Sequence, residues 1–172
     1  MRSIDLSALS SRYAVRRLGP DDADLILALC AENPQFYAHS PAACTRDQVL
    51  RDLALTPPGI PPAQKHCVGF FDGSTLVAVM DLVDGYPDAD TAFIGFFMVD
   101  AAWQGRGVGG AIVEEALASL RSLGYAAVRL AIDEGNPQST AFWTKHGFAV
   151  LRRIPREEGA VLLAERRILS SY

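Results

Sequence analysis

The stretch Gln104-Gly105-Arg106-Gly107-Val108-Gly109-Gly110 decides the fold, because it places four glycines within seven residues. An apolar run, Phe93 to Val99, precedes it, and a pattern with helical period, Ala111 to Leu123, follows it. Glycines let the main chain turn tightly and approach a ligand closely. The first N–H groups of a helix have no partner within the helix, and the helix dipole adds partial positive charge there. The order strand, glycine turn, helix therefore predicts a site for a phosphate or pyrophosphate.

Length and composition favour one soluble globular domain. The chain has 172 residues, of which 49% are apolar and 21% are charged. A net charge of −4 and the lack of a basic block argue against a nucleic-acid surface. No apolar run reaches the roughly 18 residues of a membrane span, and the first residues lack the apolar core of a signal peptide. We therefore expect a cytoplasmic protein that binds neither nucleic acid nor membrane.

Apolar periodicity and turn residues predict the order of elements along the chain. Strands are expected at 13–18, 66–71, 75–83, 91–99, 126–132, 148–154 and 161–168, and helices at 21–31, 45–55, 111–123 and 136–146. The proline-dense segment 56–62 is expected as a surface loop, and residues 1–11 as a peripheral arm or short helix. This order predicts a single α/β domain over residues 1–172. Its central sheet would be mixed but mostly antiparallel, with about six to seven strands flanked by about four helices.

Taken alone, the glycine loop also fits two other phosphate-binding folds. A dinucleotide-binding fold needs the loop after the first strand of a βαβ unit, but here the loop follows the fourth strand and antiparallel hairpins precede it. A P-loop needs Lys-Ser or Lys-Thr after the glycines, and neither follows. Both alternatives are disfavoured.

A second segment, Asn136 to Phe148, adds specificity; it reads Asn-Pro-Gln-Ser-Thr-Ala-Phe-Trp-Thr-Lys-His-Gly-Phe. Together with the pattern Gln104-x-x-Gly107-x-Gly109, it resembles the GNAT superfamily of acetyl-CoA-dependent N-acyltransferases. The resemblance in topology covers residues 13 to 168, and the specific motifs cover residues 93 to 148. It implies a GNAT-like fold, acetyl-CoA as the acyl donor, and a primary amine as the acceptor. The aromatic residues expected in the pocket favour a small acceptor with some apolar surface, and a polyamine, an amino acid, an antibiotic, a peptide N-terminus or a protein lysine all stay open.

The resemblance also implies which residues bind the cofactor. Main-chain groups at the end of the fourth strand would pair with the pantetheine arm, much as an added strand would. Amides of the glycine loop would hold the pyrophosphate, and Asn136 would hydrogen-bond the pantetheine arm. For Arg106 and Lys145 a solvent-facing role stays open, as does a core role for Phe142. The complete expected cofactor set is Met98, Val99, Gln104, Gly105, Arg106, Gly107, Val108, Gly109, Gly110, Asn136, Ser139, Phe142, Trp143 and Lys145.

Two proton-transfer groups that occur in the family are missing from this sequence. Many members have a tyrosine as general acid where Trp143 stands, and some have a glutamate as general base where Phe93 stands. No acid is carried over, because a CoA thiol, with a pKa of about 8.5 like that of cysteine, can leave as a thiolate. Asp81 is the candidate base, since it interrupts an apolar strand and burial would raise its pKa. The alternative to a catalytic role for Asp81 is that of a strand-end or edge aspartate paired with a neighbouring residue. The backbone N–H of Val99 is the candidate donor to the oxyanion of the tetrahedral intermediate.

The acceptor pocket is expected between the first two helices, their loop and the strand ends. Its candidate residues are Asn33, Phe36, Tyr37, Tyr86 and Trp103, with His39 as a further candidate.

The cysteines favour direct transfer in a ternary complex. Cys30, Cys44 and Cys67 lie outside both motifs and show no metal spacing, so we expect neither a covalent carrier nor a bound metal. A non-catalytic acyl-CoA-binding or regulatory domain is the alternative, because the tyrosine and the glutamate are absent. Transfer to oxygen or of a longer acyl group stays open, and the last strand, 161–168, is a candidate surface for a homodimer.

Overall fold

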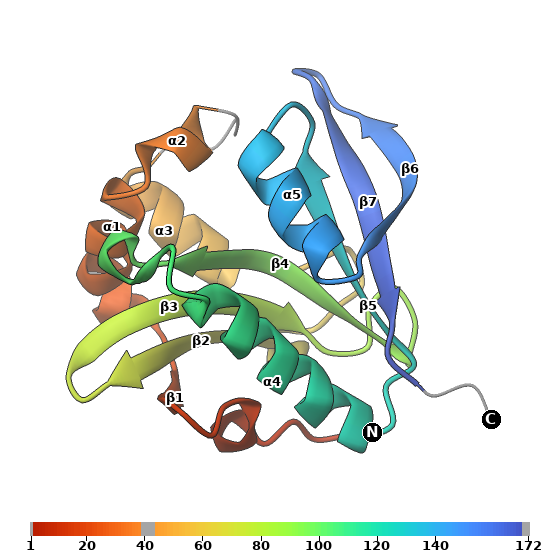
Figure 1. Ribbon diagram of the computed structural model, residues 1–172, viewed down its shortest axis with the longest axis horizontal. Helices are drawn as coiled ribbons and strands as arrows, with labels where there is room; N and C mark the ends of the chain where they lie inside the picture. Colours follow the sequence, from red (N-terminus) through yellow and green to blue (C-terminus); the bar gives the residue numbers. More distant parts are fainter. Residues whose placement is uncertain (1, 39–43, 170–172) are drawn as a thin grey trace.

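A computed structural model describes residues 2–38 and 44–169 of the chain (Figure 1). Helices labelled α are α-helices, and those labelled η are short 3-10 helices. In chain order the elements are η1 (Leu6–Leu9), β1 (Ala14–Arg17), η2 (Pro20–Asp22), α1 (Ala23–Ala31), α2 (Pro34–Tyr37), α3 (Arg46–Ala54), η3 (Pro62–Gln64), β2 (Lys65–Asp72), β3 (Thr75–Val83), β4 (Thr91–Val99), η4 (Ala101–Trp103), α4 (Val108–Ser122), β5 (Ala127–Asp133), α5 (Pro137–Lys145), β6 (Ala149–Pro155) and β7 (Ala160–Arg167).

The strands form one seven-stranded sheet in the order β1-β2-β3-β4-β5-β7-β6. Only the pair β4 and β5 is parallel, and the other five pairs are antiparallel. The predicted α/β domain with a mixed, mostly antiparallel sheet is thereby confirmed. Pairing with β5 covers only residues 91–94 of β4, so the end of β4, residues 95–99, has no partner strand on that side. The sheet is therefore open at the point where the glycine loop begins.

Helices cover both faces of the sheet, which explains why its central strands are apolar on both sides. α4 and α5 pack on one face, where Met80 and Ile94 belong to the same cluster as Val113 and Trp143. α1 and α3 pack on the other face, where a second cluster joins Val79 and Met98 to these helices. Figure 1 shows α4 crossing in front of β2 to β4, with α1 and α3 beyond the sheet.

The first residues form the short helix η1, one of the two expected alternatives, but they pack into the core and are not a peripheral arm. Leu9 of η1 is fully buried and Ile4 is 7% exposed. Both lie in the main hydrophobic cluster with α4 and the sheet, and η1 contacts β1 and α4. Their hydrophobic free energy therefore contributes to the stability of the whole domain.

Two further details differ from the sequence prediction. No pattern predicted α2, whose first residue is Pro34; proline is tolerated there because the first N–H of a helix has no partner. The strand proposed for a homodimer, β7, lies between β5 and β6 with both edges paired, so it has no free edge for a second copy. The outer strand on that side of the sheet is β6.

Candidate active site

The glycine loop joins β4 to α4 through two backbone conformations that favour glycine. Gly105 and Gly107 both have a φ of 75°, in the left-handed region. Gly107 is the N-cap of α4, which runs for 15 residues from Val108. The first N–H groups of α4 have no acceptor within the helix, so donors that suit an anion lie directly after the loop.

The other two glycines allow α4 to pack closely against its neighbours. A Cβ at Gly109 would lie 3.2 Å from Val99 Cγ2 and 3.5 Å from Phe142 Cε2. A Cβ at Gly110 would lie 2.7 Å from Cε1 and 2.8 Å from Nε2 of His146. The start of α4 therefore sits against the end of β4 on one side and against α5 on the other.

A cavity of about 790 Å³ opens between these elements and extends to the junction of α1 and α2. It brings together most of the predicted site. From the expected cofactor set, the residues that line it are Met98, Val99, Gln104, Gly105, Gly107, Val108, Gly109, Gly110, Asn136, Ser139, Phe142, Trp143 and Lys145. From the expected acceptor set, the lining residues are Asn33 and Phe36.

The cavity also has lining residues that sequence reasoning missed. They are Glu32, Pro34, Gln35, Phe97, Ala111, Gln138 and His146. Each lies close in sequence to a predicted residue, so extending the two motifs and the α1–α2 junction by a few positions would have found them. Among them, Glu32 brings an unexpected carboxylate to the end of the cavity at the α1–α2 junction.

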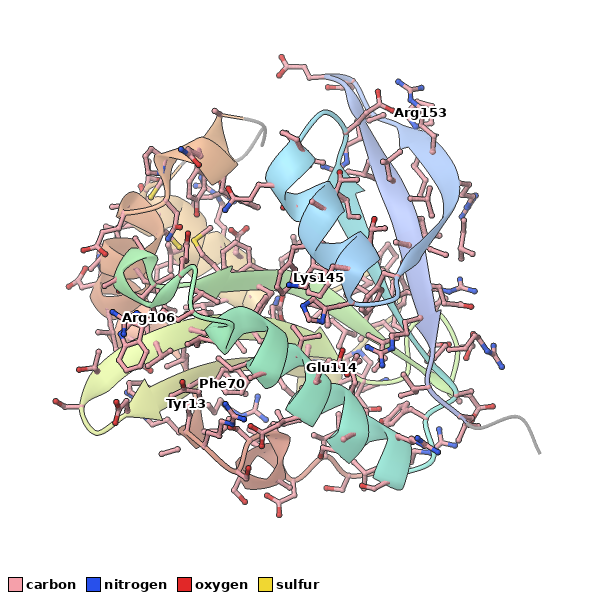
Figure 2. All side chains as sticks on the ribbon, viewed as in Figure 1. Tyr13, Phe70, Arg106, Glu114, Lys145 and Arg153 are labelled. Carbon is pink, nitrogen blue, oxygen red and sulfur yellow. The ribbon has the colours of Figure 1, made fainter. Side chains whose placement is uncertain are left out.

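Several predicted residues lie outside the cavity lining. The Arg106 guanidinium lies over the Trp103 ring, with Cζ 5.7 Å from the ring centroid. Trp103 in turn packs edge-on against Tyr13. Tyr86 packs edge-on against Phe93. Figure 2 shows Arg106 on the glycine loop and Lys145 at the end of α5.

Tyr37 and His39 complete the expected acceptor set. The Tyr37 ring packs edge-on against Phe36 at 5.1 Å but does not line the cavity. His39 lies outside the described residues.

Two side-chain amides join the α1–α2 junction to the end of β4. Gln104 Nε2 donates to the Val99 carbonyl at 2.8 Å and to Asn33 Oδ1 at 2.5 Å. Asn33 Nδ2 donates to the carbonyls of Leu29 at 3.0 Å and Val99 at 3.4 Å. The acceptor candidate Asn33 and the cofactor candidate Gln104 therefore contact each other across the cavity wall.

Asn136 and Trp143 position α5. Asn136 is 4% exposed and caps the helix, because its Oδ1 accepts from the Ser139 N–H at 3.1 Å. Trp143 is buried and packs edge-on against Phe142 and Phe148. The indole therefore has a core role as well as a place in the cavity wall.

Asp81 lies in a buried ion pair. Its Oδ2 is 2.7 Å from Lys65 Nζ, and the Lys65 side chain is only 8% exposed. Burial raises the pKa of Asp81, and Lys65 opposes that rise. The other oxygen, Oδ1, is buried without a hydrogen-bond partner in the described part of the chain. The paired alternative is therefore observed for Oδ2, whereas Oδ1 is buried and unpaired in the described residues.

The position of Asp81 relates it to the open end of β4. Asp81 pairs with Phe96, beside the irregularity of β4 at Gly95, and lies on the sheet face that α1 and α3 cover. A Cβ at Gly95 would lie 3.0 Å from Asp81 Oδ2, so glycine leaves room for this carboxylate. Asp81 does not line the cavity itself.

A polar network holds α5 against α4 on the opposite side of the sheet. Glu114 of α4 accepts from Arg166 of β7 at 2.7 and 3.2 Å and lies 3.2 Å from His146 Nδ1. Arg166 also donates to the His146 carbonyl at 2.9 Å. The Arg166 hydrogen bond, with a smaller contribution from His146, lowers the pKa of Glu114. Figure 2 shows Glu114 on α4.

The described residues contain neither a membrane-spanning helix nor a cluster of metal ligands. Within residues 2–38 and 44–169, no helix combines the length and the apolar character that crossing a bilayer requires. No group of three or more His, Cys, Asp or Glu side chains in those ranges could hold a metal ion.

The glycine-capped helix, the open end of β4 and the continuous cavity define an acetyltransferase domain. Residues 28–148 match the model of the Acetyltransferase (GNAT) family, and the chain belongs to this family. The resemblance inferred from the two sequence motifs is thereby confirmed.

Known proteins resemble this chain in sequence or in fold. A mycothiol acetyltransferase of Jonesia denitrificans is 25% identical over 142 residues, which are 82% of this chain and 44% of that protein, so the chain spans less than half of that relative. An acetyltransferase structure from Thermus thermophilus has a TM-score of 0.71 at 24% identity and covers 89% of this chain and 95% of its own. A PaiA N-acetyltransferase from Thermoplasma acidophilum, solved in complex with coenzyme A, has a TM-score of 0.64 at 18% identity. The match covers 89% of this chain and 97% of the PaiA chain.

Proposed function

We propose that the protein transfers an acetyl group from acetyl-CoA to a primary amine of a small acceptor, by direct attack in a ternary complex. The observation that supports this most is the single cavity, which joins the free N–H groups of α4 to the unpaired end of β4 and to the α1–α2 junction. The end at the start of α4 suits a pyrophosphate, and the middle, along the end of β4, suits the extended, amide-bearing pantetheine arm. The end at the α1–α2 junction leaves room for an acceptor.

The residues have the following roles in this proposal. N–H groups from Gly105 to Gly110 bind the pyrophosphate, and the main chain of Met98 and Val99 pairs with the pantetheine arm on the side where β5 is absent. The Val99 N–H donates to the oxyanion that forms when the amine attacks the acetyl carbon.

Proton transfer completes the proposed step. As the new C–N bond forms and the thioester C–S bond breaks, the sulfur leaves as a thiolate, since a thiol pKa of about 8.5 requires no acid. Before the attack, Asp81 takes one proton of the ammonium group with its unpaired Oδ1, through water because Asp81 does not line the cavity. The nitrogen loses its second proton to water as the tetrahedral intermediate collapses to the neutral amide.

A non-catalytic acyl-CoA-binding domain is the second candidate. It is favoured by the buried Trp143 and by Phe93, which stand where family members have their acid and base. Consumption of acetyl-CoA over a panel of primary amines separates the two functions. Turnover of any amine supports transfer, whereas CoA binding without turnover supports the binding domain.

Gly107→Glu tests the cofactor site itself. The glutamate places a negative charge and a side chain where the pyrophosphate would bind, and Gly107 has a left-handed conformation that non-glycine residues rarely adopt. We expect the Kd of CoA, measured by calorimetry, to rise by at least about tenfold, which corresponds to roughly 1.4 kcal/mol.

Gly159→Glu is the matched control for this substitution. Gly159 has a φ of 73° and open space around it, as Gly107 does, but it does not line the cavity. Gly159→Glu should therefore introduce the same backbone strain as Gly107→Glu but leave the affinity for CoA unchanged. Full CoA affinity in both Gly107→Glu and Gly109→Glu would show that the pyrophosphate assignment is wrong.

A further inference from the structure

The ionisable residues that line the cavity are separated between its two ends. Lys145 and His146 lie at the cofactor end, on and directly after α5, whereas Glu32 lies at the other end, directly after α1. The other lining residues within the ranges 2–38 and 44–169 have no ionisable side chain. The acceptor end therefore carries negative charge, and the cofactor end carries the groups that suit phosphates.

Glu32 keeps this negative charge available to a ligand. It is exposed, and within residues 2–38 and 44–169 no side chain forms an ion pair with it. It is also the C-cap residue of α1, a nine-residue helix whose carbonyl end adds partial negative charge. A positively charged group is therefore favoured at this end, and a carboxylate is disfavoured.

The wall beside Glu32 is aromatic. Phe36 of α2 is half-buried and packs edge-on against Phe96 of β4 at 5.7 Å. The polar groups next to it, the amides of Asn33 and Gln104, already bond to each other and to the Val99 carbonyl. What this wall offers to an acceptor is mainly an apolar surface.

We propose that the acceptor is a small cationic amine with an apolar body and no carboxylate, and that Glu32 determines this preference. The inference rests on the proposed acetyl transfer and names the class of its acceptor. The apolar body packs on Phe36, and the Glu32 carboxylate attracts the ammonium form as it enters. An α-amino acid would bring a second carboxylate to the end of the cavity that Glu32 lines, and two carboxylates at one end repel each other. Amines without a carboxylate are therefore acetylated in preference to the matching amino acids.

Matched acceptor pairs test this preference. We would measure kcat/KM with acetyl-CoA for phenethylamine against phenylalanine and for cadaverine against lysine, at low ionic strength. The carboxylate-free member of each pair should be preferred by at least about tenfold, and added salt should reduce the ratio because Glu32 is exposed. Glu32→Gln should lower the ratio mainly through KM, and Glu32→Lys should remove or reverse it.

Glu157→Gln is the control, since Glu157 is exposed in the turn between β6 and β7 and does not line the cavity. It should keep the wild-type ratio. Equal use of both members of each pair, or an unchanged ratio in Glu32→Lys, would overturn the inference and leave acetyl transfer standing. If no amine reacts while CoA still binds, the proposed function fails, and the inference fails with it.

Discussion

At the scale of single residues, the carboxylate of Asp81 is the group whose chemistry the structure defines most closely. One oxygen is bound to Lys65, and the other is buried without a partner in the described residues. Burial raises the pKa of Asp81. A carboxylate with a raised pKa accepts a proton more readily than an exposed one does, provided that it is ionised at the working pH.

Asp81→Asn should therefore slow acetyl transfer and change its dependence on pH. In the wild type, kcat/KM should fall as the pH drops through the pKa of Asp81, because the protonated acid cannot take a proton from the amine. Asparagine should lower kcat/KM by about 10²-fold to 10⁴-fold and remove this acidic decline. Rates measured over pH with phenethylamine check both effects. Asp72→Asn, at the exposed end of β2, is the control, and an unchanged profile in Asp81→Asn would exclude Asp81 as the base.

The sequence predicted this residue but not its surroundings. An aspartate within an apolar strand stands out, so Asp81 could be selected from the pattern alone. Its pairing with Lys65 depends on the register between β2 and β3, and the space beside it depends on Gly95 of β4. Such contacts join residues far apart in the chain, and the local pattern contains no information on them.

At the scale of elements, α4 and α5 form two walls of the cavity at the end where we propose that CoA binds. The network of Glu114, His146 and Arg166 joins these walls, and the ring of His146 lies against Gly110. If this network fixes the distance between α4 and α5 before CoA binds, less conformational entropy of the protein is lost on binding.

Glu114→Gln should weaken CoA binding more than it weakens the fold. The Glu114–Arg166 pair is partly exposed, so we expect a loss of only about 0.5 kcal/mol in stability. The Kd of CoA should rise by roughly threefold to tenfold, as expected when an ordered wall is loosened. Glu134→Gln removes a similar bidentate pair with Arg153 away from the cavity and should leave the Kd unchanged. Equal effects of the two substitutions on CoA binding would contradict this role.

The pH dependence of this stability difference has a definite sign. The folded-state pKa of Glu114 lies below its ordinary value of 4.5, so its contribution is present above that value. It is lost as the pH falls through the folded pKa. Thermal unfolding of wild type and Glu114→Gln should therefore differ near neutral pH and converge in acid.

Element boundaries show why the sequence was more informative for strands than for the site. The alternation of apolar residues and the Asp72-Gly73 turn predicted β2 and β3 within one residue. The pattern placed the start of α4 at Ala111, but the helix begins at Val108, within the glycine loop. Glycines lower intrinsic helix propensity, so no local signal predicts a helix that is held there by contacts with β4 and α5.

At the scale of the whole molecule, the sheet order and the two helical layers produce the site. The expected fold class followed from the order of elements and from the two motifs. The cavity did not, because it depends on where β5 stops pairing with β4 and on the position of the α1–α2 junction. The N-terminal segment was also misjudged, since a few apolar residues in a polar-mixed stretch do not reveal which cluster they join.

Leu9→Ala measures how far this segment belongs to the domain. Leu9 is fully buried in the main cluster, and truncating such a leucine typically costs about 2–5 kcal/mol. For a chain of this length, each kcal/mol lowers Tm by roughly 2–4 °C, so calorimetry should show a decrease of at least about 4 °C. Leu55→Ala, at a leucine that is 66% exposed, should change Tm little. A decrease no larger than that of Leu55→Ala would show that the first residues pack on the domain without stabilising it.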